Sequence, residues 1–294
     1  MPESHAFAIT ESGREHVRGD PTLIFPWWSF TKTAIAIRAL GLHERGTIDL
    51  DAPLEGTGYT PRQLLAHTAG LPDYGALAAY HRAVAAGEDP WPRDRLLGAA
   101  LAGGPLFAPG EGWAYSNIGY MFAREHLEAA TGRSLASLLD EMILRPLGLG
   151  SVELATTRAA FSRVHWRAAA SYHPGWVYHG CLIGSARDAA MLLRGLVSGQ
   201  LLGAEAWRAM RAPRRLGDAV PGRPWTEHGY GLGLMIGRMG KAGRAIGHSG
   251  GGPFGTCAVY HFPDRPDPVT VACFAEGTDP GGPESDAAGI AARL

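Results

Sequence analysis

The chain has 294 residues and a formal net charge of −1, with 46% hydrophobic and 19% charged residues. This balance fits one large domain with a substantial core and argues against nucleic acid or an anionic membrane as the main partner. Three scattered cysteines without a C-x-x-C pair argue against a disulfide framework or a zinc site, and without a signal peptide or a membrane-spanning run we expect a cytoplasmic protein.

The predicted elements change in character along the chain. A short strand is expected at 6–10, with 15–18 as its hairpin partner. The apolar run 27–40 predicts a buried helix that ends at Gly41. Capping residues and apolar patterns predict later helices at 60–67, 93–102, 116–131, 134–144, 185–197 and 204–211. Glycine- and proline-separated strands follow at 231–239, 244–248, 256–262 and 269–275, with a closing helix at 287–294.

Strands therefore come first and last, with helices between them. We predict an α+β fold in a single domain, 1–294, whose antiparallel sheet joins both chain ends (about 1–28 and 228–294). The intervening residues, about 29–227, are expected to form an inserted, mainly helical lobe. A functional site is expected where the two parts meet.

The apolar run contains an S-x-x-K motif, Ser29-Phe30-Thr31-Lys32. Residues three apart share one face of a helix, so the Ser29 hydroxyl and the Lys32 amine can meet. In a low-dielectric setting the lysine pKa falls, and the neutral amine can take the serine proton. The alternative is that Ser29 is only an N-cap, because S-x-x-K is common by chance.

Lysine usage favours the catalytic interpretation. Of the 27 Lys and Arg residues, only Lys32 and Lys241 are lysines. A buried lysine can give up its proton, whereas arginine stays charged in proteins. A rare lysine one turn after a serine on an apolar helix therefore fits a base better than a surface charge.

Two further clusters suggest chemistry. Tyr115-Ser116-Asn117 stands at a predicted helix start, where the structural alternative is a buried tyrosine and a capping serine. The segment 247–253 is rich in glycine and lies on or after a predicted strand; its structural alternative is a hairpin turn. Glycine also allows a backbone N–H to approach a ligand closely, as an oxyanion hole requires.

Taken in this order, the clusters resemble the serine β-lactamase and penicillin-binding-protein superfamily, and within it the class C β-lactamase, DD-peptidase and family VIII esterase group. The resemblance implies a β-lactamase-like fold with the active site between sheet and helical lobe. It also implies acyl transfer from a small-molecule substrate through an acyl-enzyme, with no metal or organic cofactor. The matching segments are 41–53, 64–72, 109–120, 131–134, 145–149 and 247–251.

The resemblance also implies roles for individual residues. Ser29 would be the acylated nucleophile, Lys32 its proton partner, and Tyr115 the general base and acid. The N–H of Ser29 and that of Gly251 would form the oxyanion hole. The residues expected to bind the substrate or the oxyanion are Asn117, His248, Ser249, Gly250 and Gly251.

Three features depart from the usual family pattern. Trp28 precedes Ser29 where a small residue is usual, so a bulky ring is expected to narrow the pocket or shift the helix. The segment between the first strand and Ser29 is short, which predicts a thin cleft wall. His248 stands where many β-lactamases have lysine, and a mainly neutral imidazole attracts a substrate carboxylate less than an ammonium does.

The segment 165–179 is rich in aromatic and histidine side chains. It is interpreted either as hydrophobic packing or as a substrate-facing wall formed by Trp28, Trp166 and Trp176. A metal site is a third interpretation, but the histidine spacing matches no familiar ligand pattern and we predict none. Cys181 follows the loop and would be a nucleophile only with a paired base, which the sequence does not identify.

These observations favour a cytoplasmic serine hydrolase that acts on a small ester or amide. One alternative is a β-lactamase or a D-alanyl carboxypeptidase or D-aminopeptidase, whose usual substrates lie outside the cytoplasm. An alternative of another class is an acyl-transfer or penicillin-binding module that is acylated and turns over slowly.

Overall fold

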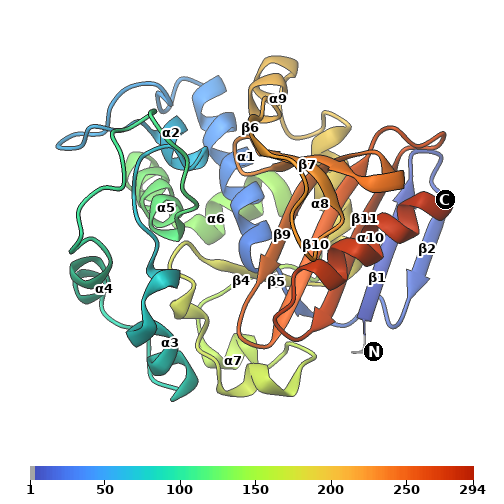
Figure 1. Cartoon of the computed structure of the whole chain (residues 1–294), viewed down its shortest axis with the longest axis horizontal. Helices are drawn as coiled ribbons and strands as arrows, with labels where there is room; N and C mark the ends of the chain where they lie inside the picture. The colour runs from blue at the N-terminus through green and yellow to red at the C-terminus, as the bar shows by residue number, and fades with distance from the viewer. Residues whose placement is uncertain (1–3) are drawn as a thin grey trace.

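The computed structural model describes residues 4–294, and within them an eight-stranded antiparallel sheet is the main framework. Its strand order is β2-β1-β11-β10-β9-β8-β7-β6, so β1 and β11 from the two ends of the chain are neighbours (Figure 1). The strands are β1 Ser4–Thr10, β2 Glu15–Arg18, β6 Arg214–Gly217, β7 Trp225–Tyr230, β8 Met235–Met239, β9 Arg244–Gly251, β10 Gly255–Phe262 and β11 Val269–Glu276.

The α+β prediction is confirmed, with two changes in the strands that precede β9. The predicted strand at 231–239 begins only at Met235, because the preceding residues form the turn between β7 and β8. The sheet also includes β6, so it begins before the predicted boundary near 228. Half-exposed, polar edge strands lack the apolar pattern that marks a buried strand, which explains why the sequence did not reveal β6.

Helices cover both faces of the sheet. Side chains alternate along β11, so Val271 and Cys273 face α10 while Ala272 and Phe274 face the larger core that contains α8 and α1. In Figure 1, α2 to α5 gather on the side away from the two chain ends. The helices are α1 Thr31–Glu44, α2 Pro61–Leu65, α3 Ala78–Ala85, α4 Arg93–Ala100, α5 Asn117–Thr131, α6 Leu135–Leu139, α7 Arg158–Phe161, α8 Ala186–Val197, α9 Ala204–Met210 and α10 Gly281–Arg293.

Shorter elements link these parts. A second sheet, in the order β3-β5-β4, lies under the start of α1. None of the helices within 4–294 combines the length and apolar character needed to cross a membrane. The short elements are β3 Phe25–Pro26, β4 Glu153–Ala155, β5 Cys181–Gly184, the π-helical turn η3 Asp140–Leu144, and the 3₁₀ turns η1 Trp28–Phe30, η2 Tyr74–Ala76, η4 Arg167–Ser171, η5 Pro174–Trp176 and η6 Gly240–Ala242.

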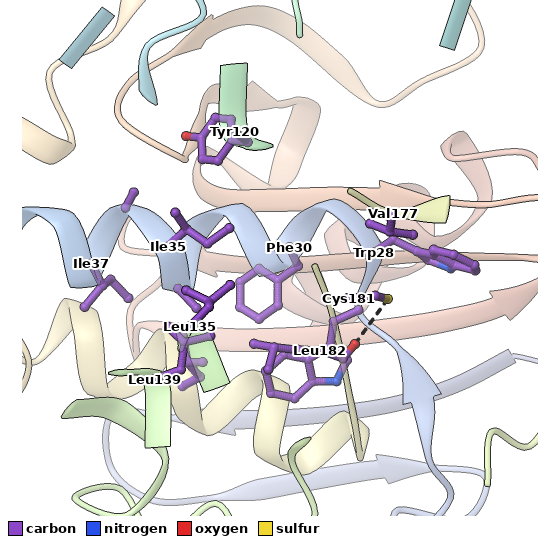
Figure 2. Packing of buried hydrophobic residues seen from close by; sticks show 14 of the residues in the cluster. Trp28, Phe30, Ile35, Ile37, Tyr120, Leu135, Leu139, Val177, Cys181 and Leu182 are labelled. Atoms are coloured by element: carbon purple, nitrogen blue, oxygen red, sulfur yellow. Dashed lines mark hydrogen bonds between the residues drawn. The ribbon is translucent and has the colours of Figure 1, made fainter. Parts of the chain in front are cut away.

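Helix α1 is the centre of the larger core. Residues 31–42 are all buried. Figure 2 shows Tyr120 of α5 on one side of α1, and Leu135 and Leu139 of α6 with Leu182 of β5 on the other. The start of α1 is also tied to β5, because the Leu182 N–H donates to Thr31 Oγ1 at 2.9 Å. This packing fixes the residues at the start of α1 from several directions.

The capping predictions are confirmed for α2 and α5, whereas the predicted end of α1 is wrong. Thr60 forms a capping box with Gln63 before α2. Ser116 caps α5, and Gly132 ends it in the left-handed conformation with φ 65°. Gly41 instead lies inside α1, which continues to Glu44; a side chain at 41 would contact Met142 and Leu202.

Candidate active site

Four of the predicted site residues converge at the start of α1. Lys32 Nζ lies 3.0 Å from Ser29 Oγ and 2.7 Å from Asn117 Oδ1. The Tyr115 hydroxyl donates to Ser29 Oγ at 2.8 Å. Ser29 Oγ therefore lies between an amine that can accept its proton and a phenol that can donate one.

Burial separates the proton affinities of these two groups. Lys32 is fully buried, and the loss of solvation lowers its pKa to about 7, although the nearby Asp73 carboxylate partly opposes the shift. Burial acts in the opposite direction on a phenol, and it raises the pKa of Tyr115 well above its usual value. Near neutral pH, much of Lys32 is thus a neutral amine while Tyr115 keeps its proton.

Asp73 supports the cluster and was not predicted from the sequence. It accepts hydrogen bonds from the Asn117 backbone N–H at 2.9 Å and from the Asn117 side-chain amide at 3.1 Å. These contacts turn the amide oxygen of Asn117 toward Lys32. Burial raises the pKa of Asp73, opposed by these hydrogen bonds and by Lys32. The sequence feature that could have identified Asp73 as a site residue is its position directly after the 64–72 motif.

The ring of His67 packs against the ring of Tyr115. It adopts the left-handed backbone conformation, with φ 58°, which is unusual for a residue with a side chain. Its ring centroid lies 4.3 Å from that of Tyr115, and its Nδ1 accepts the Ser116 N–H at 3.1 Å. The 64–72 motif therefore has a structural role, because His67 packs against the ring of the site residue Tyr115.

The third motif approaches Ser29 through glycine. A Cβ added at Gly250 would lie 2.8 Å from both Ser29 N and Trp27 O, so no larger residue fits between β9 and η1. Gly251 follows at the end of β9 and borders a cavity that also contains Ser29 in its wall. This close approach is what a backbone oxyanion hole at Ser29 requires.

His248 and Ser249 point to different partners. His248 Nε2 lies 2.9 Å from the Tyr230 hydroxyl, and its Nδ1 contacts the Ser249 carbonyl oxygen. Burial lowers the pKa of His248 to about 3, so the ring is neutral at physiological pH. The Ser249 hydroxyl bonds to Tyr260 and to the buried Glu284 carboxylate, and Ser249 also borders the cavity.

Trp28 forms part of the cavity wall in a strained conformation. Its φ is 45°, which costs a non-glycine residue of order 1–3 kcal/mol, and such strain is concentrated at functional sites. Its buried ring packs edge-on against Phe161, Tyr172 and Phe254, with centroids 5.4 to 5.9 Å away. Trp28 thus borders the cavity beside Ser29, while most of its ring is packed within this aromatic cluster.

Trp166 and Trp176 do not border this cavity. Trp166 packs against Phe25, with ring centroids 5.2 Å apart. Trp176 packs against Tyr80 and donates its indole N–H to the Glu88 carbonyl oxygen. Both rings are almost completely buried in the core, so hydrophobic packing describes them. The residues of the 165–179 segment that border the cavity are Tyr172, Val177 and His179.

The three histidines of that segment also go to separate places. His165 packs against Phe25, His173 caps its own turn, and His179 contacts Lys32. Within 4–294 they form no group whose atoms could share a metal ion. Cys181 is buried outside the cavity lining, and desolvation raises its thiol pKa to about 12, which disfavours the thiolate a nucleophile needs.

A cavity of about 1130 Å³ opens at Ser29 between the helical lobe and the sheet. One side is aromatic and includes Trp28, Tyr74 and Tyr172. The other side includes Arg223, whose guanidinium forms a two-point ion pair with the buried Glu284. The ion pair neutralises this arginine, whereas the exposed Arg214 and Arg215 of β6 also border the cavity.

Comparison with known proteins gives consistent matches. The family model described as Beta-lactamase matches residues 3–294. Penicillin-binding protein 4* of Bacillus subtilis (strain 168) is 25% identical over 94% of this chain and 66% of its own length. Esterase EstB of Burkholderia gladioli is 32% identical over 58% of this chain and 46% of its own length. The chain thus spans less than two thirds of these curated relatives.

Solved structures share the fold at low sequence identity. D-amino acid amidase from Ochrobactrum anthropi SV3 superposes with a TM-score of 0.84 at 20% identity, over 99% of this chain and 95% of that protein. A D-stereospecific amidohydrolase from Streptomyces sp. gives a TM-score of 0.80 at 24% identity, over 98% and 92% of the two chains.

Proposed function

Because the chain belongs to the Beta-lactamase family, we propose that it is a serine hydrolase that cleaves a small ester or amide through an acyl-enzyme. The observation that carries the proposal is the position of Ser29 Oγ, 3.0 Å from a desolvated lysine amine and 2.8 Å from a tyrosine hydroxyl. A capping serine would need neither neighbour.

In the proposed first step Ser29 is the nucleophile and Lys32 is the base. Ser29 Oγ attacks the carbonyl carbon of the substrate while its proton passes to the neutral amine of Lys32. The negative charge that develops on the carbonyl oxygen is held by the backbone N–H groups of Ser29 and Gly251. Both N–H groups belong to segments that packing fixes in advance.

The second step releases the leaving group. The carbon–oxygen or carbon–nitrogen bond breaks as the leaving group takes a proton from Tyr115, and Lys32 then returns a proton to the tyrosinate. Water next attacks the acyl-enzyme and transfers its proton to the same pair. Ser29 recovers its proton when the acid product departs.

The part of the cavity wall that contains His248 and Arg223 favours an uncharged acyl group, while Arg214 and Arg215 of β6 line another part. The third-motif position holds a neutral imidazole, and Arg223 is compensated by Glu284. The aromatic side of the cavity offers apolar surface. A β-lactamase or D-amino-acid peptidase remains the alternative, and the amidase structures above make D-amino-acid amides necessary members of any substrate panel.

We expect a serine-reactive phosphonate to modify Ser29 alone. This serine, unlike Ser116 and Ser249, has both a lysine amine and a tyrosine hydroxyl at its oxygen. Peptide mass spectrometry should place the adduct on the peptide that contains Ser29. An adduct on Ser116, Ser249 or Cys181 would refute the assignment.

We expect kcat/KM for short-chain or aryl esters to exceed that for β-lactams by at least about tenfold, a difference of about 1.4 kcal/mol in barrier. β-Lactams carry a carboxylate, and His248 supplies no charge to hold it. The assay compares p-nitrophenyl butyrate, nitrocefin and D-amino-acid amides. Faster hydrolysis of nitrocefin than of the butyrate would contradict the expectation.

His248→Lys should shift this ratio toward carboxylate-bearing substrates by adding a cation. His248→Gln is the matched control, because it keeps a neutral group that can bond to Tyr230. If the lysine variant leaves the ratio unchanged, the third-motif charge does not select the substrate.

The kinetics of the wild-type protein test the alternative of a penicillin-binding module. A burst of product without steady turnover would favour this slowly hydrolysing module over a hydrolase.

A further inference from the structure

His179 contacts Lys32 and belongs to none of the three catalytic motifs. Its Nε2 lies 3.1 Å from Lys32 Nζ, and only 2% of the residue is exposed. The chain fixes its position: Gly180 follows with φ 99°, and β5 begins at the next residue. The Leu182 N–H of β5 donates a hydrogen bond to Thr31 Oγ1 at the start of α1. This contact fixes the segment that carries the His179 imidazole relative to the helix that carries the Lys32 amine.

The three neighbours of Lys32 Nζ determine where its protons point. They are Ser29 Oγ, Asn117 Oδ1 and His179 Nε2, at 3.0, 2.7 and 3.1 Å. An ammonium has three N–H donors, and a neutral amine has two donors and one lone pair. If Asn117 and His179 each accept one proton in both states, the remaining direction faces Ser29. It carries the lone pair before proton transfer and the third proton afterwards.

The electrostatics of His179 agree with an acceptor role. Burial and the nearby Lys32 charge lower the pKa of His179 well below its usual value, so its ring is neutral. With the ring proton on Nδ1, Nε2 is free to accept from Lys32. Nδ1 itself is buried and has no hydrogen-bond partner among the described residues, so no second contact dictates the opposite tautomer.

We propose that His179 is a positioning residue which, together with Asn117, holds two protons of the Lys32 amine so that its lone pair faces Ser29. This inference rests on the proposed role of Lys32 as the base. It assigns the third histidine of the 165–179 segment to proton transfer.

The two lysines of the chain make a direct measurement practicable. Protein labelled with [ε-¹³C]lysine should give two lysine signals, and the exposed Lys241 serves as the internal reference. The shift of the Lys32 signal with pH reports its ionisation whether or not the enzyme turns over.

Other ionisable groups face Lys32 and His179, and every variant below retains them. They are His67, Asp73, Tyr115, Tyr120, Arg124, Cys181 and His248.

His179→Leu should lower the pKa of Lys32 by about one unit, because hydrogen bonds to charged groups are about twice as strong as neutral ones and the ammonium loses more than the amine. The acidic limb of kcat/KM should move to lower pH, while the plateau falls about tenfold because the lone pair is no longer directed. His179→Gln, whose amide oxygen reaches the Nε2 position, should restore both.

Two controls separate this effect from general damage. His173→Leu changes a histidine of the same segment that lies outside the cavity, and it should leave the Lys32 titration unchanged. His179→Asn places its amide near the Nδ1 position and should behave as the leucine variant does. The Asn and Gln pair therefore decides the question if His179→Leu does not fold.

An unchanged Lys32 titration and acidic limb in His179→Leu or His179→Asn would overturn the proposal. Equal losses in His179→Gln and His179→Asn would overturn it as well, since reach to Lys32 would then be irrelevant. A failure of the proposed function is distinguishable: Lys32→Arg would remain active, while the Lys32 titration would still report the contact with His179.

Discussion

Lys32→Arg should abolish nearly all hydrolysis, with a loss of roughly 10³-fold, within the range expected for a lost general base. Arginine keeps the positive charge but cannot release its proton, so it cannot accept one from Ser29. The pH dependence tests the same point in the wild type. The pKa of Lys32 is lowered to about 7, so kcat/KM should rise with pH through about 7 as the amine loses its proton.

The second lysine provides the matched control. Lys241→Arg makes the same substitution at an exposed position outside the cavity and should be silent. Lys32→Met covers the case in which the larger guanidinium disturbs the buried site, and circular dichroism checks the fold of each variant. If Lys32→Arg keeps more than about a tenth of the rate, within about 1.4 kcal/mol of the wild-type barrier, Lys32 is not the base.

The sequence predicted the elements whose signals are local. Ser116 before α5 and Gly132 after it mark that helix by capping chemistry, and both positions are confirmed. The apolar pattern of β10 and β11 likewise identified central strands. Such signals depend on a few neighbouring residues, so one sequence suffices to interpret them.

Contacts between distant segments could not be predicted in this way. Asp73 reaches Asn117 across 44 positions, and His179 reaches Lys32 across 147. Neither residue type is unusual where it stands, and their importance depends on tertiary packing. The aromatic segment 165–179 illustrates the same limit, because composition alone did not separate Tyr172 at the cavity from Trp166 and Trp176 in the core.

The tyrosine of the second motif should be almost as important as the lysine. Tyr115→Phe removes only the hydroxyl that donates to Ser29 Oγ at 2.8 Å, and the ring contact with His67 is retained. We expect a loss of roughly 10²–10⁴-fold in kcat, the usual range for a general acid–base group. Burial raises the pKa of Tyr115, so the hydroxyl is a proton donor to the leaving group throughout the neutral range.

The choice of leaving group makes this expectation specific. An alkoxide needs a proton from Tyr115 more than a nitrophenolate does, so the loss in Tyr115→Phe should be larger for an ethyl ester than for the matching p-nitrophenyl ester. Tyr178→Phe is the control, since its hydroxyl donates to the Trp91 carbonyl oxygen outside the cavity. Equal losses for both esters would show that Tyr115 does not protonate the leaving group and acts only on Ser29 before it is acylated.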